Sequence, residues 1–151
     1  MSSLLVHLVF IGLVIAITLL NTGTLSWHPL QLIYYIFAMV YLLLGLAWII
    51  ASVQVFFRDV SQVVAIFTQI GFWGTPIVWS LDSLPERFRF FVKLNPLYYL
   101  IEGYRKSLVY NQGFWQEESW LHLYFWCFST VCFVVGVVVY KKLKPFFADV
   151  L

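Results

Sequence analysis

Charged residues are nearly absent from the first half of this chain. Between Met1 and Leu81 the only charged side chains are those of Arg58 and Asp59, and long apolar runs lie on both sides of that pair. Over all 151 residues, 11% are charged and 62% are hydrophobic, and the mean hydropathy is +0.89. Soluble domains carry about 25% charged residues. The chain is therefore expected to be an all-α polytopic membrane protein, since apolar runs of this length cross a bilayer as helices.

The apolar residues form four runs of roughly membrane-spanning length, within one transmembrane domain over residues 1–151. The second run would be about 42 Å long as a helix, so it must tilt or project from the membrane. In the third run, Gly71, Gly74, Thr75 and Pro76 predict a kink or an unwound segment, because proline removes a backbone hydrogen bond. The four expected spans cover about residues 4–20, 30–57, 60–81 and 120–140.

A helical hairpin is predicted between the third and fourth runs, over residues 83–113. This stretch is too polar to cross a bilayer and too rich in Phe, Tyr and Leu to be an ordinary aqueous loop. Ser83 followed by Glu86 fits a capping box, which predicts a helix beginning just after the serine. Asn95 followed by Pro96 predicts a break and a second helix starting at the proline, because asparagine suits an N-cap and proline the first helical position.

The second helix of the hairpin should contain an ion pair, because Glu102 lies three and four residues before Arg105 and Lys106. Two placements of the hairpin stay open. It is either an amphipathic loop at the membrane interface or a re-entrant hairpin dipping toward a pore, where water or protein must satisfy the backbone at the break. In both cases its basic side chains are expected near water: Arg87, Arg89, Lys93, Arg105 and Lys106.

The distribution of lysines predicts the orientation in the plasma membrane. Lys141, Lys142 and Lys144 directly follow the fourth run, and basic residues favour the cytoplasmic side. The C-terminus is therefore expected in the cytoplasm, with the Arg58-Asp59 turn on the same side and the hairpin on the outer face. The hairpin then carries five basic residues against four inside, so either its charges meet an anionic substrate or one run does not fully cross.

The Arg58-Asp59 turn itself has two interpretations. It is either a local ion pair that marks the turn or a contact point for a cytoplasmic partner.

Several function classes are disfavoured by the sequence. A net charge of +2 without a long basic run argues against nucleic-acid binding, and no Gly-x-x-x-x-Gly-Lys loop is present to bind ATP. Ser129 has no base nearby except His122, which is weak support for an intramembrane enzyme. Cys127 and Cys132 are expected to be packing residues, and the histidines have no metal-ligand spacing. No catalytic residue, metal site or cofactor is therefore expected in this chain.

A series of short motifs resembles a known family of membrane proteins. Their order and spacing are similar to those in the C-terminal part of type-2 ABC-transporter permeases, which export polysaccharides and polyol phosphates. Within that group, residues 93–99 and 102–105 are most similar to teichoic-acid exporter permeases of Gram-positive bacteria. The motifs are Phe57-Arg58-Asp59-Val60, Thr75-Pro76-Ile77, Leu94-Asn95-Pro96-Leu97, Ile101-Glu102-Gly103-Tyr104-Arg105 and Phe146-Phe147-Ala148-Asp149.

The resemblance implies a homodimeric permease in the membrane lipid that works with two copies of a separate ATPase, which binds ATP and Mg²⁺. Family members have about six spans, so the four here correspond to the third through sixth, and the chain is expected to be a fragment or half-length product lacking the first two. The turn at Arg58 and Asp59 would lie near the ATPase and mediate coupling. The hairpin would lie on the outer face near the pore exit.

The implied substrate is a lipid-linked teichoic acid, an anionic glycopolymer. Basic residues would attract its phosphates and aromatic residues would give a lining with weak contacts, since tight binding would block release. O-antigen or capsular polysaccharide is the alternative; a structural or assembly protein without a substrate path is a further one, indicated by a dry face around Gln62 and Gln69. The residues assigned to the path are Trp73, Trp79, Tyr98, Tyr99, Arg87, Arg89, Lys93, Arg105 and Lys106.

Overall fold

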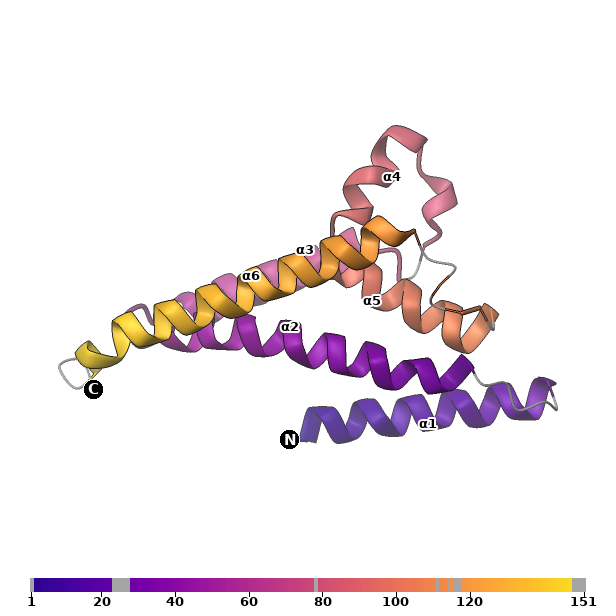
Figure 1. Ribbon diagram of the computed structural model, residues 1–151, viewed down its shortest axis with the longest axis horizontal. Helices are drawn as coiled ribbons and strands as arrows, with labels where there is room; N and C mark the ends of the chain where they lie inside the picture. Colours follow the sequence, from indigo (N-terminus) through magenta and orange to yellow (C-terminus); the bar gives the residue numbers. More distant parts are fainter. Residues whose placement is uncertain are drawn as a thin grey trace.

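Two long helices lie side by side and form the centre of the protein (Figure 1). The computed structural model describes residues 2–22, 28–77, 79–110, 112–113, 115 and 118–147. This part of the chain is mostly helical and contains no strand. The α-helices are α1 (Ser2–Thr22), α2 (Gln31–Gln54), α3 (Val60–Gly74), α4 (Glu86–Lys93), α5 (Pro96–Arg105) and α6 (Ser119–Leu143), with short helical turns η1 (His28–Leu30), η2 (Leu81–Ser83), η3 (Lys106–Tyr110) and η5 (Lys144–Phe146).

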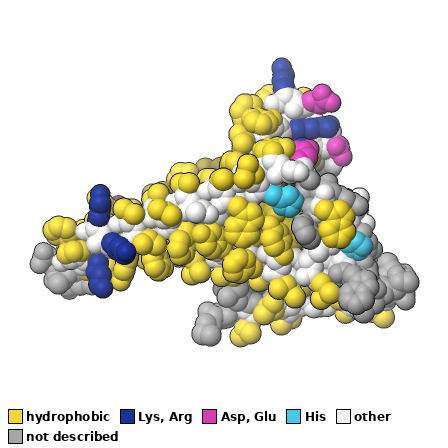
Figure 2. Space-filling model, in the orientation of Figure 1, with side chains coloured by type: hydrophobic (Ala, Val, Ile, Leu, Met, Phe, Trp, Pro, Cys, Tyr) yellow, Lys and Arg dark blue, Asp and Glu magenta, His cyan; other side chains and the backbone are white. Residues whose placement is uncertain are grey.

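The central helices α2 and α6 have the length and composition to cross a membrane. Their apolar segments, Gln31–Gln54 and Ser119–Phe146, contain 24 and 28 residues. Only 22% and 17% of their most apolar windows are buried, so most of their apolar surface is available to lipid or to a partner. The core helix of a soluble protein would be mostly buried. The exposed apolar surface is visible as a band between the two ends of the molecule in Figure 2.

The other two expected spans have shorter apolar helical segments, Leu5–Thr18 and Val60–Gly74. Helix α3 ends at Gly74, within the predicted span over residues 60–81 and at the interruption that the sequence predicts. Thr75 is extended, with φ −106° and ψ 137°, because the residue before a proline is driven out of the helical region. The predicted interruption is therefore the end of the helix, about 22 Å from its start.

The two ends of the molecule are distinct (Figure 1). The turn between α2 and α3 lies beside the C-terminal end of α6, where the rings of Phe56 and Phe147 are 6.0 Å apart. Helices α4 and α5 lie at the opposite end. Basic side chains gather at the C-terminal end of α6 and again around α4 (Figure 2).

The close packing of α2 on α6 depends on two glycines. A Cβ added to Gly45 would lie 2.7 Å from the backbone nitrogen of Phe133, and one added to Gly136 would lie 2.7 Å from the carbonyl oxygen of Gly45. Small residues allow helix backbones to approach this closely in membranes. Aromatic rings cover the seam, with Phe133 stacked between Tyr41, at 5.1 Å, and Trp48, at 5.8 Å.

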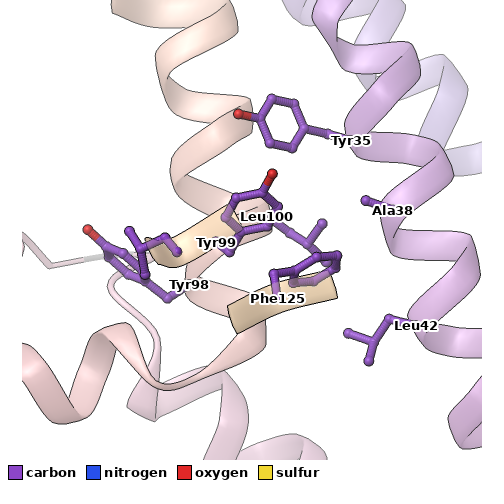
Figure 3. Packing of buried hydrophobic residues seen from close by; sticks show 8 residues of the cluster. Tyr35, Ala38, Leu42, Tyr98, Tyr99, Leu100 and Phe125 are labelled. Carbon is purple, nitrogen blue, oxygen red and sulfur yellow. The ribbon is translucent and has the colours of Figure 1, made fainter. Parts of the chain in front are cut away.

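The buried core lies near the hairpin end of this helix pair (Figure 3). Helix α5 is part of this core together with the two long helices. It packs closely on α2, since the ring of Tyr35 lies directly over Gly103 and would collide with a Cβ at that position. The core residues are Tyr35, Ala38 and Leu42 of α2, Tyr98, Tyr99 and Leu100 of α5, and Leu121 and Phe125 of α6.

We expect Gly136→Leu to destabilise the protein by about 1–3 kcal/mol, the usual cost of overpacking, because the backbone of Gly45 cannot move away like a side chain. Equilibrium unfolding in detergent micelles would measure the change. Gly12→Ala is the matched control, since nothing lies within 4 Å of its added Cβ and alanine is the better helix former. Equal unfolding midpoints for the two variants would contradict the backbone contact.

Candidate functional site

The hairpin at one end of the molecule consists of η2, α4 and α5, but its first helix begins later than the capping box predicts. Helix α4 starts at Glu86, and Pro85 precedes it without a side-chain cap. Ser83 instead ends η2, where the hydroxyl of Ser80 accepts the backbone N–H of Asp82 at 3.3 Å. The capping-box prediction is wrong because Pro85 forces Leu84 into an extended conformation, with ψ 143°.

The predicted break between α4 and α5 is confirmed. The side-chain oxygen of Asn95 accepts the backbone N–H of Leu97 at 3.0 Å, and Pro96 is the first residue of α5. Helix α4 is held at this point by α6, since the hydroxyl of Tyr124 donates to the carbonyl of Leu94. The break is therefore capped by Asn95 and attached to α6 by Tyr124.

The amide of Asn95 also fixes the end of α3. Its nitrogen donates to the hydroxyl oxygen of Thr75 at 2.8 Å, and that hydroxyl donates to the carbonyl of Gly71 at 2.6 Å. The side chain of Thr75 is fully buried, at 0% exposure. One threonine thus joins the last turn of α3 to the start of α5.

A second contact fixes the end of α3 one residue further on. Arg105 donates to the carbonyl of Pro76 at 2.6 Å and to the carboxylate of Glu102 at 3.1 Å. The predicted pairing of Glu102 with Arg105 is therefore confirmed. We refer to Thr75, Pro76, Asn95 and Arg105 as the α3 clamp; no residue of α3 itself is buried, so these polar contacts are a large part of what positions its end.

Most of the basic residues assigned to the substrate path are paired with carboxylates. Arg89 lies 3.6 Å from the carboxylate of Asp82 and donates to two backbone carbonyls, Lys93 bridges to Glu118, and Arg105 pairs with Glu102. The hydrogen bond from Lys93 lowers the pKa of Glu118, so this carboxyl stays ionised at neutral pH. The positive charges of the hairpin are thus largely balanced.

The two remaining basic residues of the hairpin lie outside these pairs. Arg87 is exposed and lies over the ring of Phe88, 4.9 Å from its centre. Lys106 begins η3, the turn that follows α5.

The four aromatic residues assigned to the path do not form one surface. Trp73 is 64% exposed, and Trp79 donates its indole N–H to the carbonyl of Trp73 at 3.3 Å. Tyr98 and Tyr99 are instead buried in the core, at 6% and 2% exposure. They do not line a path on the surface of this chain, because α5 points this face between α2 and α6.

A partly buried hydrogen-bond chain explains the position of Tyr99. Its hydroxyl contacts the hydroxyl of Tyr34 at 2.9 Å and the Nδ1 of His122 at 2.7 Å, and the indole of Trp126 donates to Tyr34 at 2.7 Å. The sequence indicated His122 only as a base near Ser129 and as a histidine without metal-ligand spacing. Ser129 is buried and its hydroxyl has no hydrogen-bond partner, so within the described residues it does not form a nucleophile-base pair with His122.

The turn between α2 and α3 carries Arg58 and Asp59, both exposed. Their side chains form no ion pair with each other or with another residue that the structure describes. Gln62 and Gln69 are also exposed, on α3.

The fold and the hairpin define a multi-helix membrane protein, and comparison with known proteins gives the family. A family model described as ABC-2 type transporter matches residues 1–109, from α1 to the end of the hairpin. The chain belongs to this family. Two O-antigen export system permease proteins named RfbA, both from Klebsiella pneumoniae, are 31% and 32% identical to it over 107 residues, which is 71% of this chain. The chain spans 40% of the length of each of these relatives.

We expect Thr75→Val to destabilise the junction of α3 and α5 by about 1–3 kcal/mol, because it leaves the partly buried amide of Asn95 without its acceptor inside the fold. Hydrogen exchange of residues 71–97 in micelles would show faster exchange at the clamp. Thr68→Val is the control: Thr68 makes the same bond to the carbonyl four residues earlier, at 2.8 Å, but is exposed. If both variants raised exchange equally, the clamp would not hold α3.

Proposed function

We propose that this chain is the membrane-spanning part of the permease of an ATP-driven exporter that moves a lipid-linked polysaccharide across the plasma membrane. The observation that carries the proposal is the family match, which runs from α1 through the hairpin and includes every residue of the α3 clamp. Two relatives named as O-antigen export permeases support polysaccharide as the cargo.

In this proposal α1, α2, α3 and α6 cross the membrane, and α4 and α5 form a re-entrant hairpin on the outer face. The burial of α5 supports the re-entrant placement over an interfacial loop, because Tyr99 packs on Phe125 with ring centres 4.5 Å apart. A loop lying flat on the membrane would bury its apolar face in lipid instead. The exposed rings of Phe88, Phe90 and Phe91 on α4 would lie at the interface.

The proposal also assigns the partners. A second copy of the permease would complete the pathway, and a separate ATPase would bind ATP and Mg²⁺ at the cytoplasmic end, where Arg58, Asp59 and the C-terminal lysines lie. Both side chains of the turn are exposed and outside any ion pair described above, so both are available to a partner. Helix α3 would carry movement of that turn to the hairpin, because its other end is held by the clamp.

The balanced charges of the hairpin bear on the cargo. Since Arg89, Lys93 and Arg105 are each paired with a carboxylate, the hairpin offers less attraction to phosphate than the sequence suggests, and a neutral or weakly charged glycan of the O-antigen kind fits best. Teichoic acid is the second candidate. It is supported by the resemblance of residues 93–99 to teichoic-acid permeases and by Arg87, which is exposed and forms no ion pair among the described residues.

The test is the ATPase activity of the reconstituted permease and ATPase with a lipid-linked cargo. We expect a lipid-linked neutral glycan to raise the rate above the basal level, because bound cargo favours the cycling state. A lipid-linked polyol-phosphate polymer is compared in parallel. If only this polymer stimulated the ATPase, teichoic acid would be identified as the cargo. A complex that hydrolyses ATP but responds to neither cargo would count against the exporter.

Reversing the turn, with Arg58→Asp and Asp59→Arg together, should weaken assembly with the ATPase, because charges at an interface set complementarity and encounter rate. Pull-down of the ATPase and its cargo-stimulated activity are the measurements. Arg87→Asp is the control, since it reverses an exposed charge at the opposite end of the molecule. If the variant with the reversed turn assembled with the ATPase as well as the unchanged chain does, Arg58 and Asp59 would have no role in coupling.

A further inference from the structure

A cleft lies between α4 and the start of α6, at the outer end of the hairpin. It is a shallow cleft of about 480 Å³ that is mostly open to its surroundings. Neither the sequence motifs nor the α3 clamp accounts for it, and it is separate from the core around Tyr99. Its lining residues are Glu86, Arg89, Phe90, Lys93, Glu118 and Trp120.

Two aromatic rings form one wall of the cleft. Phe90 of α4 and Trp120 of α6 are stacked, with ring centres 6.0 Å apart and planes 26° apart. Both are accessible, at 55% and 37% exposure. Rings that stack on each other in this way are already ordered. A ligand that covers them therefore loses little binding free energy to the ordering of side chains.

Polar groups surround these rings and are fixed in place. The carboxylate of Glu118 accepts from Lys93 and from the indole nitrogen of Trp120, the latter at 2.6 Å. Each of its oxygens keeps acceptor capacity, and Lys93 and Arg89 keep N–H donors beyond those already used. The side chain of Glu86 makes no ion pair among the described residues. The cleft therefore offers both acceptors and donors beside an aromatic surface.

The charge of the cleft decides between ligand classes. Its two carboxylates, Glu86 and Glu118, balance its two cations, Arg89 and Lys93. Just outside the lining, the negative charge of Asp82, 3.6 Å from Arg89, is matched by the positive charge of Lys106, which acts on Glu118. A phosphate would therefore meet little net attraction from the described residues. A neutral hexose suits the same surroundings, because its C–H face packs on aromatic rings while its hydroxyls both donate and accept.

We infer that this cleft binds one neutral sugar unit of the exported glycan as it leaves the membrane. The sugar ring packs on Phe90 and Trp120, and its hydroxyls bond to Glu118 and to the free N–H groups of Arg89 and Lys93. The inference rests on the proposed function and deepens it, by naming a residue set that contacts the cargo and a neutral sugar as the unit recognised. Binding at one unit is expected to be weak, which lets the chain move on.

The first experiment measures sugar binding to the chain in phosphatidylcholine nanodiscs by saturation-transfer NMR, with no ATPase present. The probes are galactose, mannose and N-acetylglucosamine, with glycerol 3-phosphate for comparison. We expect saturable binding of at least one neutral sugar and none of glycerol 3-phosphate. Preference for glycerol 3-phosphate, or no saturable sugar binding, overturns the inference.

Two adjacent phenylalanines provide the matched variants. Phe90→Ala should weaken sugar binding by about tenfold, the size of a good aromatic contact, whereas Phe91→Ala should leave it unchanged, because Phe91 is 67% exposed and lies outside the cleft. Trp120→Phe should keep most of the binding, and Trp120→Ala should lose about as much as Phe90→Ala. Equal effects of Phe90→Ala and Phe91→Ala would identify α4 as a membrane anchor and overturn the sugar site.

The outcomes separate the two proposals. If sugars do not bind but a lipid-linked glycan still stimulates the ATPase, the cleft is excluded as a cargo contact and the exporter stands. If sugars bind as expected but no cargo stimulates the ATPase, the sugar site stands and the proposed export function fails.

Discussion

The burial of α5 between α2 and α6 is the contact on which the rest of the structure depends. Pro96 and Asn95 start this helix at the correct point, and a partly buried chain of hydroxyls and ring nitrogens from Trp126 through Tyr34 to His122 satisfies the buried hydroxyl of Tyr99. Buried polar groups without partners are costly, and in lipid no water replaces them. Because α5 is fixed in this way, it can hold the end of α3, and α4 can pack beside the start of α6.

The short-range features of the hairpin could be predicted from the sequence because they depend on neighbouring residues. An asparagine before a proline caps its own helix, and Glu102 reaches Arg105 within one turn. The same local reasoning failed at Ser83, since the pattern of Ser83 and Glu86 ignores Pro85 between them. A cap requires a helical chain just after it, and the proline prevents that.

Longer-range features could not be read from spacing. The pairing of Lys93 with Glu118 joins residues 25 positions apart, and only the packing of α4 on α6 brings them together. The pattern of aromatic residues placed Tyr98 and Tyr99 in the same class as Trp73, although the first two are buried and the third is exposed. Which face of a short amphipathic helix is buried depends on the neighbours it meets. The sequence therefore predicted the helices of the hairpin better than it predicted which of their side chains are exposed.

The polar attachment of α3 has a consequence for its length. A helix whose side chains are all at least partly accessible tolerates many substitutions along its surface, since few of them disturb packing. Its length is different. Each residue added or removed between Asp59 and Thr75 turns one end relative to the other by about 100° and shifts it by about 1.5 Å. The hydroxyl of Thr75 would then no longer face Asn95. In α3 the number of residues, more than their identity, keeps the turn between α2 and α3 in phase with the hairpin at the other end of the molecule.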